Sequence, residues 1–319
     1  MTIVQRPMLE TDQTRCYGVD GRTLACEGSG QDASFEKRCA TAAADRFEVL
    51  DQVVEDRLTG AVWSQDANPA EFPLTWDEAH AYVADMRARR AHGYGNWQLP
   101  PRDLLFSLIS HQNINPALAD QHPFENLFSS YCWSADSCCR LPDQAWYIHL
   151  GGGRIHRGMK HGAYLVWPVS PAQWPGPEPG RRGSERLTSG DVGVTDHRTG
   201  LIWSKDADPV GRETTWPEAL VAIDAVNRKG LAGRSDWRLP NIRELESLVD
   251  LGRHSPALSG GQPFVNVRDA YWSSTTSVYE TRYAWTLYSQ DGGVGVGFKA
   301  GPGFHLWPVA GARPTFTGI

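Results

Sequence analysis

The pattern of apolar and polar positions occurs twice along the chain, and both copies predict the same order of elements. Residues 53–64 and 192–204 each alternate around a Thr-Gly turn, which predicts a β-hairpin. A helix should follow, because Thr75 with Glu78 and Thr215 with Glu218 have capping-box spacing. Its buried face is expected to comprise Trp76, Ala79, Val83 and Met86 in the first copy and Trp216, Ala219, Ile223 and Val226 in the second.

A second helix is expected directly after the Leu-Pro pairs at 99–100 and 239–240. It would bury Leu104, Leu105, Leu108 and Ile109 in one copy and Leu245, Leu248 and Val249 in the other. Short β segments fill the rest of each copy, in the first at 131–135, 144–150, 153–158 and 163–169. The pattern predicts an α+β fold class: a β-hairpin, two helices and a small antiparallel sheet, with the terminal strand returning beside the first hairpin.

A tandem duplication explains this repetition. Six tryptophan pairs, from Trp63 with Trp203 to Trp167 with Trp307, lie in register at a nearly constant spacing of about 140 residues. That period is too long for stacked solenoid repeats, so it indicates duplicated domains. We expect an N-terminal arm with cysteines at 1–50, packed on the first module, followed by modules at 51–170 and 191–312, a Pro/Gly-rich linker at 171–190 and a tail at 313–319.

Composition excludes some classes of protein. A net charge of −6 without a run of Lys or Arg argues against nucleic acid as a partner. No apolar stretch reaches the roughly 18 residues that a membrane-spanning helix needs, so no transmembrane segment is predicted. The N-terminal stretch MTIVQRPMLETDQTRC lacks the apolar core of a signal peptide, so either the protein stays in the cytoplasm or a leader has been removed.

The recurrent motifs resemble the Lcl C-terminal domain family, which is named for a bacterial collagen-like adhesin. They are TGL-W, DWRLP, YWSST, AW and a closing LWPV, and they extend over nearly all of 52–170 and 191–311. The first copy departs from the pattern at Gln98, at Pro101-Arg102 and in an apparent Cys-Cys-Arg insertion at 138–140. The resemblance implies a C-type-lectin-like fold, a periplasmic or cell-surface location, and binding of sulfated glycans as known for the adhesin.

A cationic segment of the first module is the sharpest candidate for ligand binding. It contains His149, Arg154, His156, Arg157, Lys160 and His161. Arginine forks onto two anionic oxygens, so such a strand suits sulfate or carboxylate groups, and protonation of the histidines would strengthen binding. The alternative is an ordinary solvated strand face. Alternation places Arg154 and His156 on one face, and the second copy has lost nearly all of this charge.

Six cysteines allow disulfides or a metal site. Cys16 and Cys26 flank a turn-like segment, which favours a small disulfide loop in an oxidising compartment. Cys132, Cys138 and Cys139, with the nearby histidines, could instead ligate zinc or copper, although their spacing is atypical. A disulfide from Cys39 to one of them, or buried thiols, is the alternative, so their pairing stays open.

Further candidates lie in the second module: Tyr279, Glu280, Arg282 and Tyr288 cluster in the loop-and-strand region that faces ligand in lectin-like folds. Trp272 and Trp285 are expected in the core, and Asp56 and Asp196 are expected to cap turns and not to bind calcium. No motif for nucleophilic, phosphate-binding or zinc-protease chemistry occurs.

These observations favour a recognition or adhesion protein that binds a glycan or another, anionic, surface polymer and needs no cofactor. The first alternative is a metal-dependent or redox enzyme related in fold to formylglycine-generating enzymes, with copper or zinc at the cysteines. The second is a structural subunit of a surface assembly, with other proteins or further copies of itself as partners. Calcium dependence stays open.

Overall fold

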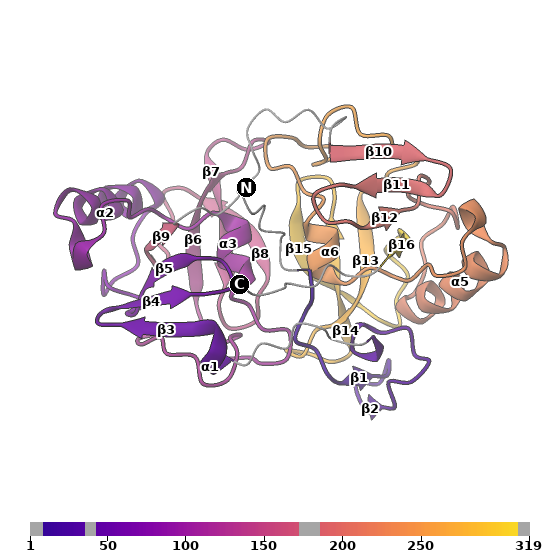
Figure 1. Ribbon diagram of the computed structural model, residues 1–319, viewed down its shortest axis with the longest axis horizontal. Helices are drawn as coiled ribbons and strands as arrows, with labels where there is room; N and C mark the ends of the chain where they lie inside the picture. The colour runs from indigo at the N-terminus through magenta and orange to yellow at the C-terminus, as the bar shows by residue number, and fades with distance from the viewer. Residues whose placement is uncertain (1–8, 36–42, 172–185, 312–319) are drawn as a thin grey trace. The chain divides into compact units, whose positions relative to one another are not determined.

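The computed structural model describes residues 9–35, 43–171 and 186–311, and these form two compact units (Figure 1). One unit is the first module, residues 43–171. The other contains the second module, residues 186–311, together with the arm, which from here on means residues 9–35. The predicted linker at 171–190 and tail at 313–319 fall largely outside the described residues.

The first module consists of two antiparallel sheets and two main helices. Its elements are α1 (Ala43–Arg46), β3 (Phe47–Leu50), β4 (Val53–Asp56), β5 (Ala61–Ser64), α2 (Trp76–Ala88), η2 (Ala91–Gly93), α3 (Arg102–Ser107), β6 (Tyr131–Ser137), β7 (Gln144–His149), β8 (Ile155–Met159) and β9 (Val169–Pro171). The edge strand β3 extends the predicted hairpin on its N-terminal side. It comes from a segment that sequence analysis assigned to the arm.

The second module repeats this order. Its elements are β10 (Leu187–Gly190), β11 (Gly193–Asp196), β12 (Ile202–Trp203), α5 (Trp216–Arg228), η3 (Leu231–Gly233), α6 (Ile242–Glu246), β13 (Ala270–Thr276), β14 (Tyr283–Tyr288), β15 (Gly293–Phe298) and β16 (Val309–Ala310). The arm adds β1 (Cys16–Tyr17), β2 (Thr23–Leu24) and η1 (Asp32–Ser34). The prediction of helices combined with antiparallel sheets in two similar halves is confirmed.

The last strand of each module returns to the first hairpin, as predicted. The hairpin sheets have the orders β3-β4-β5-β9 and β10-β11-β12-β16. In the first, Trp63 pairs with Val169, and in the second, Trp203 pairs with Val309. The strands β6-β7-β8 and β13-β14-β15 form antiparallel meanders between the second helix and this returning strand. The chain therefore enters and leaves each module on one sheet.

The predicted helix signals are also confirmed. Both long helices begin at a threonine in a complete capping box, Thr75 with Glu78 and Thr215 with Glu218. The hydrogen bond from Thr75 lowers the pKa of Glu78, and the same geometry lowers the pKa of Glu218. The second helices, α3 and α6, are shorter than predicted, one to two turns each, so Leu108, Ile109, Leu248 and Val249 lie beyond their ends.

Tryptophans anchor both cores through the same contacts. Each indole Nε1 of four matched pairs donates to a main-chain oxygen, with distances of 2.7–3.1 Å. Trp133 bonds Leu74 O in one module, and Trp272 bonds Thr214 O in the other. A buried indole usually finds such a partner, and the equal bonding indicates that these four positions have the same surroundings in both modules. Trp272 and Trp285 are buried, as predicted.

A buried ion pair closes the first hairpin of each module. The carboxylate of Asp56 accepts from Arg46 Nη2 at 2.7 Å, and that of Asp196 accepts from Arg186 Nη2 at 2.8 Å. The two aspartates also accept the main-chain N–H groups of Leu58 and Arg198 in the turns. The prediction that both aspartates cap turns is confirmed.

The arm packs on the second module, so the prediction that it packs on the first is wrong. The side chain of Gln13 bonds both main-chain groups of Thr276, at 2.8 and 2.9 Å. Asn241 donates to Leu9 O at 2.8 Å. Sequence position suggested the neighbouring module, but the second module supplies the polar side chains, Asn241 among them, that hold the arm.

A glycine in β15 makes close packing of the second core possible. A Cβ atom at Gly297 would lie 2.6 Å from the Trp272 ring and would also meet Phe304. Gly297→Ala is therefore expected to lower the free energy of unfolding by about 1–3 kcal/mol, since overpacking a buried site forces its neighbours to move. Gly303→Ala is the matched control, because a Cβ atom added at Gly303 would meet no atom within 4 Å apart from its chain neighbours. Urea unfolding would measure both, and equal stability of the two variants would contradict the packing argument.

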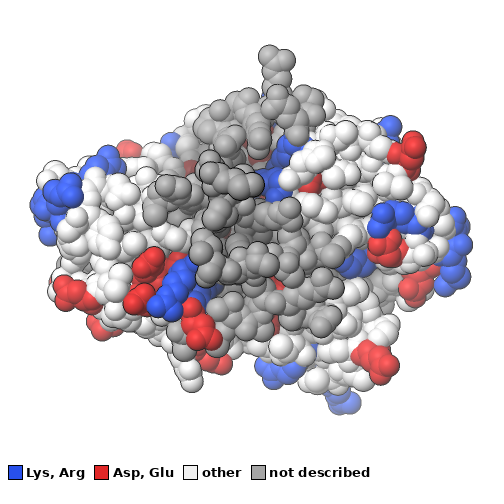
Figure 2. All heavy atoms as spheres, viewed as in Figure 1, with Lys and Arg blue, Asp and Glu red and all other residues white. Residues whose placement is uncertain are grey.

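Acidic and basic side chains lie interspersed over the described part of the face drawn in Figure 2. In the part of the chain that the structure describes, no helix has the length and apolar character required to cross a bilayer.

Candidate recognition surfaces

A cluster of three tyrosines lies on one face of the β6-β7-β8 meander in the first module, and we call it the tyrosine face. It comprises Tyr131, Tyr147 and Tyr164, whose ring centroids lie 4.9–5.5 Å apart. Tyr131 is 42% exposed, and the buried ring of Trp133 supports Tyr164 at 4.4 Å. Antiparallel register explains the grouping: Tyr131 pairs with His149, and Tyr147 pairs with His156.

The second module has no equivalent tyrosine cluster at these positions. Ala270 and Thr286 replace Tyr131 and Tyr147, and Phe304 replaces Tyr164 and packs on Trp272. Thr286 is fully buried. The first module alone therefore presents this set of rings.

The six cationic candidates do not share one surface. His149 and His156 lie beside the tyrosine face, with ring distances of 5.0 Å to Tyr131 and 6.1 Å to Tyr147. Arg154 is exposed immediately before β8, and His161 is exposed in the turn after it. Arg157 stacks over Trp146, so it faces the other side of the sheet.

Burial and the nearby Arg154 hold the pKa of His149 below its usual value. The lowered pKa favours the neutral form of His149. Arg154 therefore supplies positive charge at the edge of the tyrosine face, and protonation of His149 adds to it in acid.

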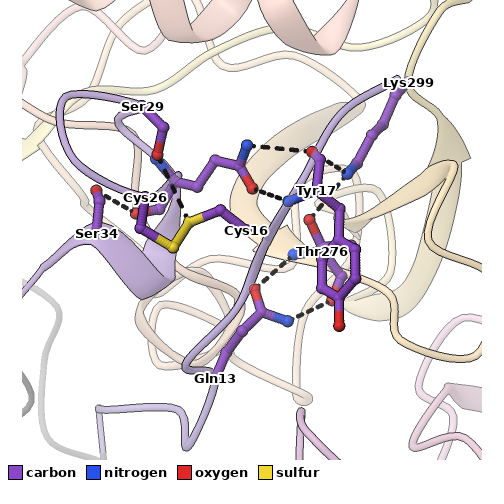
Figure 3. The surroundings of a disulfide bond; sticks show 9 residues. Gln13, Cys16, Tyr17, Cys26, Ser29, Ser34, Thr276 and Lys299 are labelled. Atoms are coloured by element: carbon purple, nitrogen blue, oxygen red, sulfur yellow. Dashed lines mark hydrogen bonds between the residues drawn. A yellow bond between two sulfur atoms is a disulfide. The ribbon is translucent and has the colours of Figure 1, made fainter. Parts of the chain in front are cut away.

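Lys299 is the most unusual charged residue of the second module. It is fully buried, and its ammonium lies 4.2 Å from the ring centroid of Trp216 at the start of α5. Nζ donates to Tyr17 O of the arm at 3.0 Å and to Thr276 Oγ1 at 2.9 Å (Figure 3). Burial lowers its pKa to about 7, although Asp20 acts in the opposite direction.

The arm covers this lysine with polar contacts along its length. A disulfide joins Cys16 to Cys26, as predicted (Figure 3). Gln31 holds the loop by bonding both main-chain groups of Tyr17. Thr281 Oγ1 donates to Gly21 O at 2.8 Å, and Thr275 Oγ1 donates to the buried carboxylate of Asp32 at 2.9 Å. The arm is thus a segment with a disulfide-closed hairpin, bound in place by main-chain and side-chain hydrogen bonds.

The second-module candidates fall at two ends of one strand, so the predicted cluster does not form. Tyr279, Glu280 and Arg282 lie in the loop before β14, whereas Tyr288 is its last residue. Arg282 donates to Glu280 at 2.9 Å and lowers the pKa of that carboxyl group to about 2. Tyr288 instead lies over Gly295, where a Cβ atom would meet its ring at 2.9 Å.

The cysteines of the first module differ in burial. Cys132 and Cys138 are buried, Cys139 is exposed, and burial raises the pKa of Cys132 to about 12. Among the described residues, no group of three His, Cys, Asp or Glu side chains could hold a metal ion. Cys39 lies outside those residues. Cys138 N bonds Gln144 O as Ser277 N bonds Tyr283 O, so Cys138–Arg140 replace residues of the second copy and are not an insertion.

Sequence reasoning missed the tyrosine face and Lys299. Alternation along β6 and β7 could have indicated the tyrosines, because Tyr131 and Trp133 share a face with Tyr147. The spacing that relates Trp133 to Trp272 also relates Lys160 to Lys299. The repeat could therefore have singled out the lysine pair, but only the structure shows that the arm covers one of them.

The comparison with protein families gives one result. The model of the Lcl C-terminal domain matches the chain twice, at residues 52–170 and 193–310, which is well over half of its length. No curated protein matches the chain.

Proposed function

Because the chain belongs to the Lcl C-terminal domain family, we propose that it is an exported recognition protein whose first module binds a glycan or another anionic surface polymer. The family suggests a surface or adhesion role, and the finer assignment is our own. We also infer a C-type-lectin-like fold for each module from the family resemblance and the order of its elements.

The observation that carries this proposal is the tyrosine face. Partly exposed rings on a rigid sheet offer flat apolar surfaces, and the C–H groups of a sugar ring pack against them while the hydroxyls stay hydrated. Arg154 lies close enough to influence His149 at the edge of this face. A guanidinium there would add a charge-assisted contact to a sulfate or carboxylate group.

The disulfide supports an extracytoplasmic location. Cys16–Cys26 joins a buried to a partly buried cysteine in the arm, and such bonds persist in oxidising compartments. Protein partners and self-assembly remain alternatives to a glycan, and the experiment below separates them from the main proposal.

Binding to an array of neutral and sulfated glycans would test the proposal. Tyr131→Ala is expected to weaken retention about 3- to 10-fold, since an aromatic contact contributes about 0.5–1.5 kcal/mol. Arg154→Ala should weaken retention of sulfated glycans alone, and added salt should have the same effect. Phe72→Ala is the matched control, because Phe72 is a 69% exposed aromatic of the same module that lies outside the tyrosine face. Absence of retention on every glycan, or equal loss in the control, would refute the proposal.

A further inference from the structure

The two modules share a lysine–tryptophan pair that one of them covers and the other leaves open. Lys160 Nζ lies 4.3 Å from the Trp76 ring centroid, as Lys299 Nζ lies 4.2 Å from that of Trp216. The main chain is also the same, because Trp76 N donates to Lys160 O at 3.0 Å and Trp216 N to Lys299 O at 3.1 Å. The pair is therefore one structural feature present in two copies.

Burial differs sharply between the copies. Lys299 and Thr276 are fully buried and Trp216 is 2% exposed, because the arm lies over them. In the first module, Lys160 and Trp76 are only partly buried, and Ser137, at the position of Thr276, is exposed. The first module thus presents to solvent a face whose duplicate holds a bound polypeptide segment.

The arm shows which chemistry this face accepts. Its main chain supplies the carbonyl of Tyr17 to the lysine, and a glutamine side chain bonds the strand end at Thr276. The contact with the lysine is made by a main-chain carbonyl of an extended strand residue. It therefore does not depend on which side chain that residue carries. We propose that the Trp76–Lys160 face of the first module binds an extended segment of another polypeptide chain, with a main-chain carbonyl accepting a hydrogen bond from Lys160.

The arm of a second copy would bind this face more weakly than it binds the second module. Thr275, which donates to the carboxylate of Asp32, is replaced by Asp136 in the first module, so an arm bound there would place two carboxylates together. Asn241 and Thr281, which donate to main-chain carbonyls of the arm, are replaced by Pro101 and Pro142, which carry no donor. The occupant is therefore a segment of a different protein, with a neutral or basic side chain facing Asp136.

This site lies beside the tyrosine face proposed to bind a glycan, since Trp76, Tyr147 and Tyr164 pack against one core cluster, but its proposed ligand is a polypeptide. Tyr131→Ala, which should weaken glycan binding, is expected to bind the peptide normally. Lys160→Met is expected to keep its retention on neutral glycans. Failure of either proposal can therefore be recognised separately.

The test uses a synthetic peptide of residues 9–35 with the Cys16–Cys26 disulfide formed and Asp32→Asn introduced. The fluorescence anisotropy of this peptide would be measured as the full chain is added. The chain's own arm already covers its second module, so only the first module is open to the peptide. The expected result is saturable binding that Lys160→Met weakens at least about tenfold and that Lys205→Met, a change at an exposed lysine of the second module, leaves unchanged. The peptide with Asp32 retained should bind more weakly, and Asp136→Ser in the chain should restore its binding.

Absence of saturable binding at about 1 mM peptide would overturn the proposal. So would binding that Lys160→Met does not alter. Equal binding of the peptides with and without the Asp32→Asn change would overturn the inference that the occupant comes from a different protein.

Discussion

Asp196→Ala is expected to lower the free energy of unfolding of the second module by about 3–5 kcal/mol, the usual result of removing one member of a buried ion pair. Asp196 has no exposed surface, and the side chain of Arg186 is 13% exposed. The guanidinium also donates to Ser247 O at 2.6 Å, which ties β10 to the segment after α6. Without the carboxylate, a largely desolvated positive charge is left unpaired and the turn loses its acceptor for Arg198 N.

Urea unfolding of the full chain, followed by tryptophan fluorescence, would measure this loss. Asp191→Ala is the control, because Asp191 is an exposed aspartate a few residues away. The duplication supplies a second check: Asp56→Ala should destabilise the first module to a similar degree through Arg46. A loss below about 1 kcal/mol, the range typical of exposed ion pairs, would contradict the assignment of a buried pair.

Raising the pH from about 7 to 10 is expected to strengthen docking of the arm by up to about tenfold per pH unit. With the arm docked, burial lowers the pKa of Lys299 from 10.5 to about 7. A released arm leaves the lysine in water with its ordinary pKa, so between these values the released state binds one more proton. Higher pH therefore favours the docked state, and below about 7 both states hold the proton and the dependence ends.

The measurement is the free energy of arm release in urea at several pH values, reported by the part of the tryptophan fluorescence change that a Trp216→Phe background removes. Lys299→Met should remove the pH dependence, since the proton that links docking to pH is gone. Lys205→Met should keep the slope of the unmodified chain. If the free energy of arm release changes with pH equally in Lys299→Met and in the unmodified chain, a group other than Lys299 causes the pH dependence.

Local signals and the repeat predicted much of the fold. The capping boxes, the hairpin turns and the return of the last strand depend on residues near one another in sequence, or on a pattern that occurs twice. Each element predicted in one copy was supported by the same element in the other. The spacing between matched residues stays nearly constant along the whole module, which indicates a common structure. The disulfide was predictable for the same reason, since Cys16 and Cys26 flank a short turn.

The placement of the arm and the division of the candidate site residues were not predictable in this way. Gln13 meets Thr276 across 263 residues, and no local preference encodes that contact. The cationic segment looked like one site because its charges are close in sequence. Alternation along β8 sends His156 to the tyrosine face and Arg157 to Trp146 on the other side. What each face of β8 contacts depends on how the sheet packs in the folded module.

The return of the last strand to the first hairpin also bears on how the chain could be rearranged. In the sheet β3-β4-β5-β9, the first and last strands are separated by two others, so their ends lie within about 15 Å at a strand spacing of about 4.8 Å. A linker of a few residues could join them, and new termini could open in a surface loop between α2 and α3. Each module should therefore tolerate circular permutation, and insertion as a unit into a loop of an unrelated host protein.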